Sequence, residues 1–170
     1  MNLIEKYIEE ENWQKARSEI HKRLKTDKDH HWLITRLGLT YYEERKYQKS
    51  LEYAEKAIVL APDCPLVLWD YAGTLDMLGR KREAIKVYQK IIKKGINEIA
   101  FGKCGEGIRW AKSIFADSLY RLALINSYQG HKRKAIEYFE LHFSSRGKGI
   151  PSIYKLNDVK KDYKKLVNGL

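Results

Sequence analysis

Histidines and carboxylates are the side chains that most often carry acid, base or metal chemistry. This chain of 170 residues has five histidines. His30 and His31 are adjacent, so they point in different directions on a helix, and the others are His21, His131 and His142. None of these last three belongs to an HExxH motif or has a cysteine partner. The acidic run from Glu9 to Glu11 is typical of a solvated helix end. The sequence therefore predicts no catalytic residues, no cofactor and no enzymatic activity.

Two cysteines, Cys64 and Cys104, are the next candidates for reactive or metal-binding chemistry. They are widely separated, and they have neither the paired spacing of zinc ligands nor the density of a disulfide framework. We interpret both as ordinary thiols and predict no metal site.

Three glycines gather in residues 99–115, IAFGKCGEGIRWAKSIF, together with Arg109 and Trp110. Their spacing matches neither a dinucleotide fingerprint nor a phosphate loop. The apolar pattern predicts a helix that begins near Ile108, and the N-terminus of such a helix can accept an anion. The simpler interpretation is an ordinary loop. Arg109 and Trp110 are the candidate binding residues of this segment.

The net charge of +11 is unevenly distributed. Residues 1–64 carry 12 basic and 12 acidic side chains, whereas residues 65–170 carry 21 basic and 10 acidic ones. Such an excess can attract a nucleic acid, an acidic protein or a membrane surface, or it can reflect solvated lysine-rich helix faces. The basic residues form three groups, which are Arg80, Lys81, Arg82, Lys86, Lys90, Lys93 and Lys94; Lys132, Arg133 and Lys134; and Lys160, Lys161, Lys164 and Lys165.

The N-terminal sequence, MNLIEKYIEEENWQK, lacks an apolar stretch of signal-peptide length. No later run approaches the roughly 18 apolar residues that span a bilayer. We therefore expect a cytoplasmic protein without a membrane-spanning segment.

The elements that position these residues repeat along the chain. A shift of 34 residues aligns Leu37, Gly38, Tyr41, Ser50, Leu51, Ala57 and Ile58 with Tyr71, Ala72, Leu75, Ala84, Ile85, Ile91 and Ile92. A further shift of 51 residues aligns Tyr71, Ala72, Gly79, Ala84, Ile85, Tyr88 and Ile92 with Leu122, Ala123, Gly130, Ala135, Ile136, Phe139 and Phe143. Since 51 is 34 plus 17, an insertion at residues 99–115 separates these copies.

Each copy predicts a pair of antiparallel helices. Small residues on both helices, such as Gly38 and Ser50 in one copy, allow the two backbones to approach closely. Gly79 and Gly130 fall between the helices, where a left-handed residue ends the first helix. Arg45 takes that place in the first full copy, which suggests a different turn there.

At these positions the chain resembles the tetratricopeptide-repeat (TPR) family. Residues 31–64 match it through Leu37, Gly38, Tyr41, Tyr47, Ser50, Ala57 and the closing Ala61-Pro62. Residues 65–98 match through Tyr71, Ala72, Leu75, Gly79, Ala84, Tyr88 and Ile91, with Ile96 where the family often has proline. Residues 116–149 match through Leu122, Ala123, Gly130, Ala135 and Phe139, with His142 in place of a small residue. A shortened copy over about residues 1–30 is traced through Leu3, Ile4, Tyr7, Trp13, Ala16, Ile20 and Leu24.

This resemblance implies an all-α fold, an α-solenoid of helix pairs that forms a right-handed superhelix within a single domain of residues 1–170. Residues 157–170 place Val159, Tyr163, Leu166 and Leu170 on one stripe, which predicts a capping helix. Asn157 or Asp158 is its predicted N-cap.

The resemblance also implies that the first helix of each pair lines a concave groove. The groove residues predicted to bind a partner are Trp32, Arg36, Leu39, Tyr42, Trp69, Asp70, Tyr120, Arg121, Leu124 and Tyr128. Tryptophan, tyrosine and arginine dominate binding energy at protein interfaces. The alternative is that Trp32 and Trp69 only fill space between helices. Thr35, Leu39, Asp70 and Asp117 do not supply the lysines and asparagines with which one subfamily clamps a C-terminal carboxylate, so that ligand is excluded.

We therefore expect a non-enzymatic scaffold or adaptor that binds a peptide or protein segment in the groove. Length and repeat number resemble small bacterial secretion chaperones, repeat-type adaptors and immunity proteins. The alternative is binding of nucleic acid or another acidic surface through the basic C-terminal half. The identity of the partner and the oligomeric state stay open.

Overall fold

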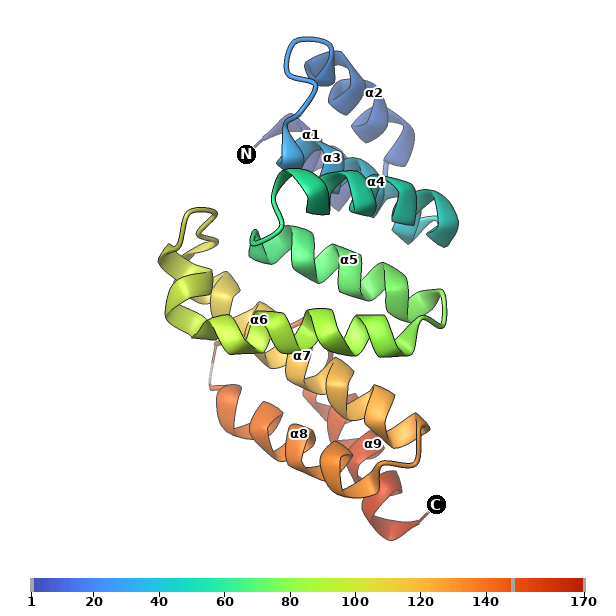
Figure 1. Cartoon of the computed structure of the whole chain (residues 1–170), viewed down its shortest axis with the longest axis vertical. Helices are drawn as coiled ribbons and strands as arrows, with labels where there is room; N and C mark the ends of the chain where they lie inside the picture. Colours follow the sequence, from blue (N-terminus) through green and yellow to red (C-terminus); the bar gives the residue numbers. More distant parts are fainter. Residues whose placement is uncertain (1, 148, 170) are drawn as a thin grey trace. The chain divides into compact units, whose positions relative to one another are not determined.

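A computed structural model describes residues 2–147 and 149–169, and within them all regular secondary structure is helical (Figure 1). Met1, Lys148 and Leu170, which fall within the first repeat, the last repeat and the capping helix predicted above, lie outside the described residues. The helices are α1 (Leu3–Glu9), α2 (Trp13–Leu24), α3 (His31–Glu43), α4 (Tyr47–Leu60), α5 (Pro65–Met77), α6 (Lys81–Phe101), α7 (Gly107–Tyr128), α8 (Lys132–Ser145) and α9 (Leu156–Asn168). The prediction of an all-α repeat fold is confirmed.

The chain divides into two compact units, residues 1–84 and residues 85–170, and the boundary falls inside α6. In the N-terminal unit α1 packs on α2, α3 on α4, and α5 on both α3 and α4. Its core contains Ile4, Ile20, Leu33 and Leu37, all at most 3% exposed. Helices α1, α2 and α3 therefore contribute apolar side chains to one shared core.

Local signals explain where several helices begin. The Asn2 side chain accepts a hydrogen bond from the Ile4 N–H at 3.2 Å, and Asn12 caps α2 by accepting from the Lys15 N–H at 3.3 Å. These caps satisfy N–H groups that have no partner inside the helix. Pro65 opens α5, where its fixed φ suits the first turn and its missing N–H is not needed.

The turns inside the four predicted helix pairs share one backbone geometry. Gly79 and Gly130 both have φ of 76°, as predicted, while Glu11 and Arg45 adopt φ of 53° and 58° at the equivalent places. In every turn this residue donates its N–H to the carbonyl three residues earlier, and the next residue donates to the carbonyl five residues earlier. The expectation of a different turn at Arg45 is therefore wrong, because the paired hydrogen bonds hold a non-glycine residue in the left-handed region.

Small residues bring paired helices together as the repeat pattern predicted. A Cβ atom on Gly38 would lie 3.4 Å from the Cβ of Tyr53 and 3.5 Å from the Ser50 carbonyl oxygen. The Ser50 hydroxyl in turn lies 3.1 Å from that of Thr74 on α5. Gly38 and Ser50 thus allow close approach on both sides of α4.

In the C-terminal unit α7 packs on α8, and α8 on α9. The insertion is mostly helical: α6 continues to Phe101 beyond a break at Gly95, which has φ of 73°, and α7 begins at Gly107. The early start predicted near Ile108 is confirmed. The expectation of an ordinary loop holds only for residues 102–106.

The capping helix α9 covers the last helix pair with Val159, Tyr163 and Leu166, which pack with Tyr120 and Phe139. Its predicted N-cap was wrong, because Lys155 takes that position without a side-chain hydrogen bond. Asp158 instead stands in the first turn, where the helix dipole favours a negative charge.

Candidate functional site

The predicted binding residues of α3 lie together in the N-terminal unit. Trp32, Arg36, Leu39 and Tyr42 are all half-buried. The Arg36 Nε donates to the Glu5 carboxylate on α1 at 2.7 Å, and its guanidinium lies 5.5 Å from the centroid of the Trp32 ring. An ion pair and a cation–π contact therefore hold both side chains in place.

Trp32 also packs against the core cluster of the N-terminal unit, which contains Ile4 and Leu37. One part of this ring thus fills space between α1 and α3, and another part stays open to a partner. Tyr42 meets Tyr47 of α4 edge to face, with ring centroids 5.3 Å apart. The face of α3 is in this way built from aromatic groups whose rotamers are restricted by neighbours.

On α5 the predicted residues Trp69 and Asp70 are half-buried. Asp76, one turn and a half further on, is only 1% exposed and pairs with Lys81 at the start of α6. The Lys81 Nζ also donates to the Asp76 carbonyl at 2.8 Å. The ion pair between Asp76 and Lys81 therefore links the end of α5 to the start of α6, and Asp76 does not face solvent.

In the C-terminal unit the chain's own segment covers part of the predicted face. Tyr120 is 4% exposed, donates from its hydroxyl to Asp162 of α9 at 2.7 Å, and meets the Tyr154 ring at 4.6 Å between centroids. Burial, followed by the hydrogen bond to Asp162, raises the pKa of Tyr120. Tyr120 thus belongs to the internal contact that α9 and its preceding segment make with α7.

One turn earlier, Asp117 is 2% exposed and accepts three hydrogen bonds. The donors are the Ser152 hydroxyl at 2.6 Å, the Ile153 N–H at 3.2 Å and the Ser113 hydroxyl at 3.3 Å. Burial raises the pKa of Asp117, and the hydrogen bonds from Ser152 and Ile153 oppose that rise. Asp117 therefore binds a bend of its own chain at residues 152–154.

The remaining predicted residues of α7 differ in exposure. Arg121 and Leu124 are half-buried, and Leu124 packs on the core beneath α9. Tyr128, at the end of α7, is 81% exposed. Arg109 and Trp110 are exposed in the first turn of α7, with Trp110 at 56%. These positions are separate parts of the helix and do not form one cluster with Tyr120.

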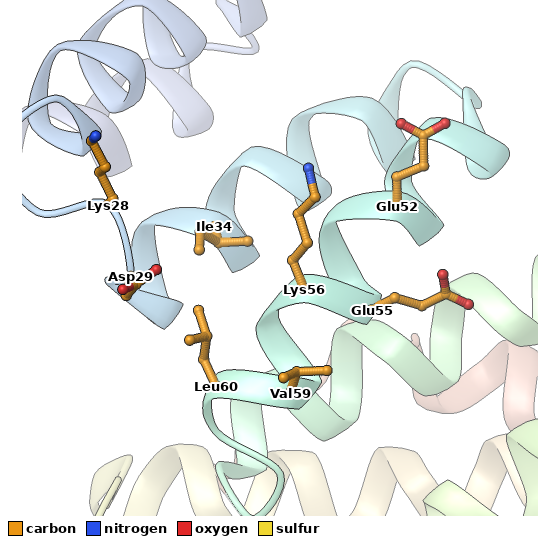
Figure 2. Close-up of a pocket in the computed structure, with 8 residues that line it drawn as sticks. All are labelled: Lys28, Asp29, Ile34, Glu52, Glu55, Lys56, Val59 and Leu60. Atoms are coloured by element: carbon orange, nitrogen blue, oxygen red, sulfur yellow. The ribbon is translucent and has the colours of Figure 1, made fainter.

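Sequence reasoning missed a hollow of about 600 Å³ beside α4. Figure 2 shows Ile34 and Leu60 directed toward a common space, with charged side chains around it. The available signal was the pair Val59 and Leu60, which are apolar but lie outside the buried stripe of α4. The lining residues are Lys28, Asp29, Ile34, Glu52, Glu55, Lys56, Val59 and Leu60.

None of the helices among the described residues is long and apolar enough to cross a membrane.

Three segments match family models of the tetratricopeptide repeat, at residues 33–64, 67–94 and 116–141. A crystal structure of MamA is similar to 99% of this chain and 94% of its own, with a TM-score of 0.67 and 21% sequence identity. A second MamA structure matches 98% of this chain and 87% of its own, with a TM-score of 0.63 and 20% identity. At this identity the likeness is one of fold. No curated protein matches the sequence.

Proposed function

The chain belongs to the tetratricopeptide-repeat family, whose helical repeats serve as scaffolds for protein–protein interaction, and we propose that it is a non-enzymatic adaptor for one partner protein. In this proposal a segment of the partner lies across the first helices α3 and α5 of the N-terminal unit. The observation that carries it is the set of half-buried aromatic and arginine side chains Trp32, Arg36, Tyr42 and Trp69. Such residues supply most of the binding energy at protein interfaces.

The fixed position of Arg36 supports a preformed binding face. Its side chain is 17% exposed and already held by Glu5 and Trp32, so a partner need not immobilise it. Because ordering of flexible side chains opposes association, a face of this kind binds at lower entropic cost. A partner segment with apolar side chains and a carboxylate near Arg36 would fit it best.

In the C-terminal unit the first helix of the last pair, α7, holds a short non-helical segment of the chain itself. There the equivalent face of α7 binds residues 152–154 through the carboxylate of Asp117 and the ring of Tyr120. A carboxylate that accepts a backbone N–H makes a charge-assisted hydrogen bond, and the neighbouring aromatic ring adds packing area. Trp69 stands on α5 at the position that Tyr120 takes on α7, so its ring can pack against a similar segment of the partner.

Capture from a lysate of the source cell tests the proposal, with the tagged protein washed at moderate salt and treated with nuclease. Trp69→Ala is expected to lose the captured protein. Tyr71→Ala, which removes another half-buried aromatic residue of α5, is the matched control and should retain it. Far-UV circular dichroism must show that both variants keep their helix content.

Two outcomes would contradict the proposal. The first is equal capture by the Trp69 variant and the wild type. The second is loss of capture in Tyr128→Ala with retention in Trp69→Ala, because Tyr128 lies on the C-terminal unit and is 81% exposed. That result would mean that the partner binds α7, and not α3 and α5.

A further inference from the structure

The net positive charge of this protein lies entirely in one unit. Residues 85–170 carry 18 basic and 7 acidic side chains, a net charge of +11, whereas residues 1–84 carry 15 of each. At least two of the seven carboxylates are bound by neighbouring groups: Asp117 is buried, and Asp162 accepts the Tyr120 hydroxyl at 2.7 Å. The exposed surface of the C-terminal unit is therefore strongly basic.

The exposed side of α9 concentrates that charge. Six exposed residues share about 140° of the helix circumference, since successive residues are about 100° apart. Val159, Tyr163 and Leu166 occupy the opposite side and pack on the core. The six exposed residues border one hollow of about 430 Å³ and include no carboxylate; they are Asn157, Lys160, Lys161, Lys164, Lys165 and Asn168.

A second basic group lies next to α9. Lys132, Arg133 and Lys134 are exposed in the first turn of α8, and this turn contains no acidic residue. The Lys132 Nζ donates to the carbonyl of Val167 at 3.2 Å, which places this turn beside the C-terminal end of α9. Lys132 therefore joins the first turn of α8 to the end of α9. We call the seven cations Lys132, Arg133, Lys134, Lys160, Lys161, Lys164 and Lys165 the α8–α9 basic surface.

Carboxylates do not neutralise this surface. Within residues 2–147 and 149–169, none of its seven cations forms an ion pair. In the N-terminal unit, by contrast, Arg17 pairs with Glu44 at 2.9 Å and Arg36 with Glu5 at 2.7 Å. Like charges one helical turn apart repel each other, and cations in the first turn of α8 are opposed by the helix dipole. A polyanion bound along this surface would relieve both effects.

We propose that the α8–α9 basic surface binds the phosphate backbone of a nucleic acid without sequence preference. Six of the seven cations are lysines, which act as point charges toward phosphate and lack the fork with which arginine reads base edges. Lysine is depleted at protein–protein interfaces, and no aromatic residue lines the hollow along α9, so an acidic protein fits less well. A lipid surface also fits less well, because α9 already buries its apolar side in the core.

Salt-dependent binding of a fluorescein-labelled duplex of 20 base pairs, of mixed sequence, tests the proposal on the full chain. Each lysine that contacts phosphate contributes about 0.9 to the slope of log affinity against log salt concentration. Lys160→Glu/Lys164→Glu is expected to reduce that slope by about 1.8 and to weaken binding at least tenfold at low salt. The matched control, Lys86→Glu/Lys93→Glu, makes the same charge change at exposed positions of α6 in the same unit and should keep the slope.

Binding of a second duplex of unrelated sequence with the same affinity and slope would support the proposal. It would be overturned if the wild type does not bind either duplex at 50 mM salt, or if both double variants lower the slope equally. It would also be overturned if polyglutamate of matched charge, or vesicles containing phosphatidylserine, bind more tightly than the duplex and lose binding in the Lys160/Lys164 variant alone. Circular dichroism of both variants checks that loss of binding is not loss of fold.

Discussion

At the level of single residues, the left-handed turn positions carry the clearest energetic consequence. Arg45 holds φ of 58° where Gly79 and Gly130 hold 76°. A non-glycine residue in this region is strained by about 1–2 kcal/mol, while glycine has the larger unfolded-state entropy. We expect Arg45→Gly to stabilise the fold by about 0.5–1 kcal/mol in chemical denaturation.

Gly79→Ala makes the reverse change at the equivalent turn. Nothing lies within 4 Å of a Cβ built on Gly79, so backbone strain is the only new effect. This variant should lose about 1 kcal/mol of unfolding free energy.

A loss of stability in Arg45→Gly would contradict the first of these two predictions. It would show that the Arg45 side chain makes a contact that outweighs its backbone strain.

His142 provides a prediction about pH. Its ring is fully buried, its Nδ1–H donates to the Ala116 carbonyl at 2.7 Å, and its Nε2 is buried without a hydrogen-bond partner among the described residues. Burial lowers the pKa of His142, and Arg146 adds to this effect, while the Ala116 carbonyl and Asp117 oppose it. The unfolded state therefore takes up a proton first as pH falls below about 6.5. Stability that is present above that pH is lost on acidification.

His142→Asn removes the titrating ring and keeps an N–H donor near the Nδ1 position. Between pH 7.5 and pH 5.5 the wild type should lose unfolding free energy, and the variant should lose less. Burial raises the pKa of Asp117 and the charge of His142 lowers it, so Asp117 opposes the loss in both proteins and opposes it more strongly in the variant. Equal pH dependence in both proteins would exclude His142 as the cause.

His142 and Tyr120 show which features of a single residue can be predicted from the sequence and which cannot. His142 was identified as a departure from the repeat pattern, since a large side chain stands where a small one is expected. Its partner, the Ala116 carbonyl, was not predictable, because it depends on the spacing of α7 and α8. For Tyr120 the sequence predicted the helix face but not that residues 152–154 and α9 cover it.

Among the elements, α2 is joined to the end of α3 by one arginine. Arg17 donates to Glu44 at 2.9 Å and to the Thr40 hydroxyl at 3.5 Å, and its guanidinium lies 4.8 Å from the centroid of the Tyr41 ring. Hydrogen bonds from Arg17 and then Lys46 lower the pKa of Glu44 to about 2. A lowered carboxyl pKa contributes stability above about pH 4.5, which is lost as pH falls toward 2.

Arg17→Met should raise the pKa of Glu44 partway toward 4.5, because Lys46 remains as a donor. The loss of unfolding free energy at neutral pH should be about 1 kcal/mol, since the pair is only partly shielded from solvent. Carboxyl-carbon NMR titration measures the pKa directly. Arg23→Met, which removes a pair with Glu19 on α2 alone, is the control and should leave the Glu44 pKa unchanged. An unshifted Glu44 pKa in Arg17→Met would show that Lys46 alone lowers it.

Helix existence was easier to predict than helix ends. The shifts of 34 and 51 residues identify the helix pairs because Gly38 of α3, Ala72 of α5 and Ala123 of α7 are buried at matching positions. The start of α9 was placed at a polar residue, but the chain begins that helix at Leu156 without a side-chain cap. Capping preference is worth only about 1 kcal/mol, so the packing of Val159 and Leu166 can outweigh it.

For the whole molecule, the position of the boundary between the two units has a thermodynamic consequence. It falls between Ala84 and Ile85, within α6 and ahead of the break at Gly95, so the residues at the boundary are helical. Helix formation is cooperative, and neighbouring repeats stabilise one another. We therefore expect residues 1–170 to unfold in one transition, as predicted for a single domain.

The tryptophans allow this prediction to be tested unit by unit. Trp13, Trp32 and Trp69 lie in the N-terminal unit and Trp110 in the C-terminal unit. In Trp110→Phe, fluorescence therefore reports only on the N-terminal unit, while far-UV circular dichroism reports on all helices. One transition requires both signals to share a midpoint in denaturant, with a calorimetric enthalpy equal to the van't Hoff enthalpy. Separate midpoints would mean that residues 1–84 and 85–170 unfold as independent domains.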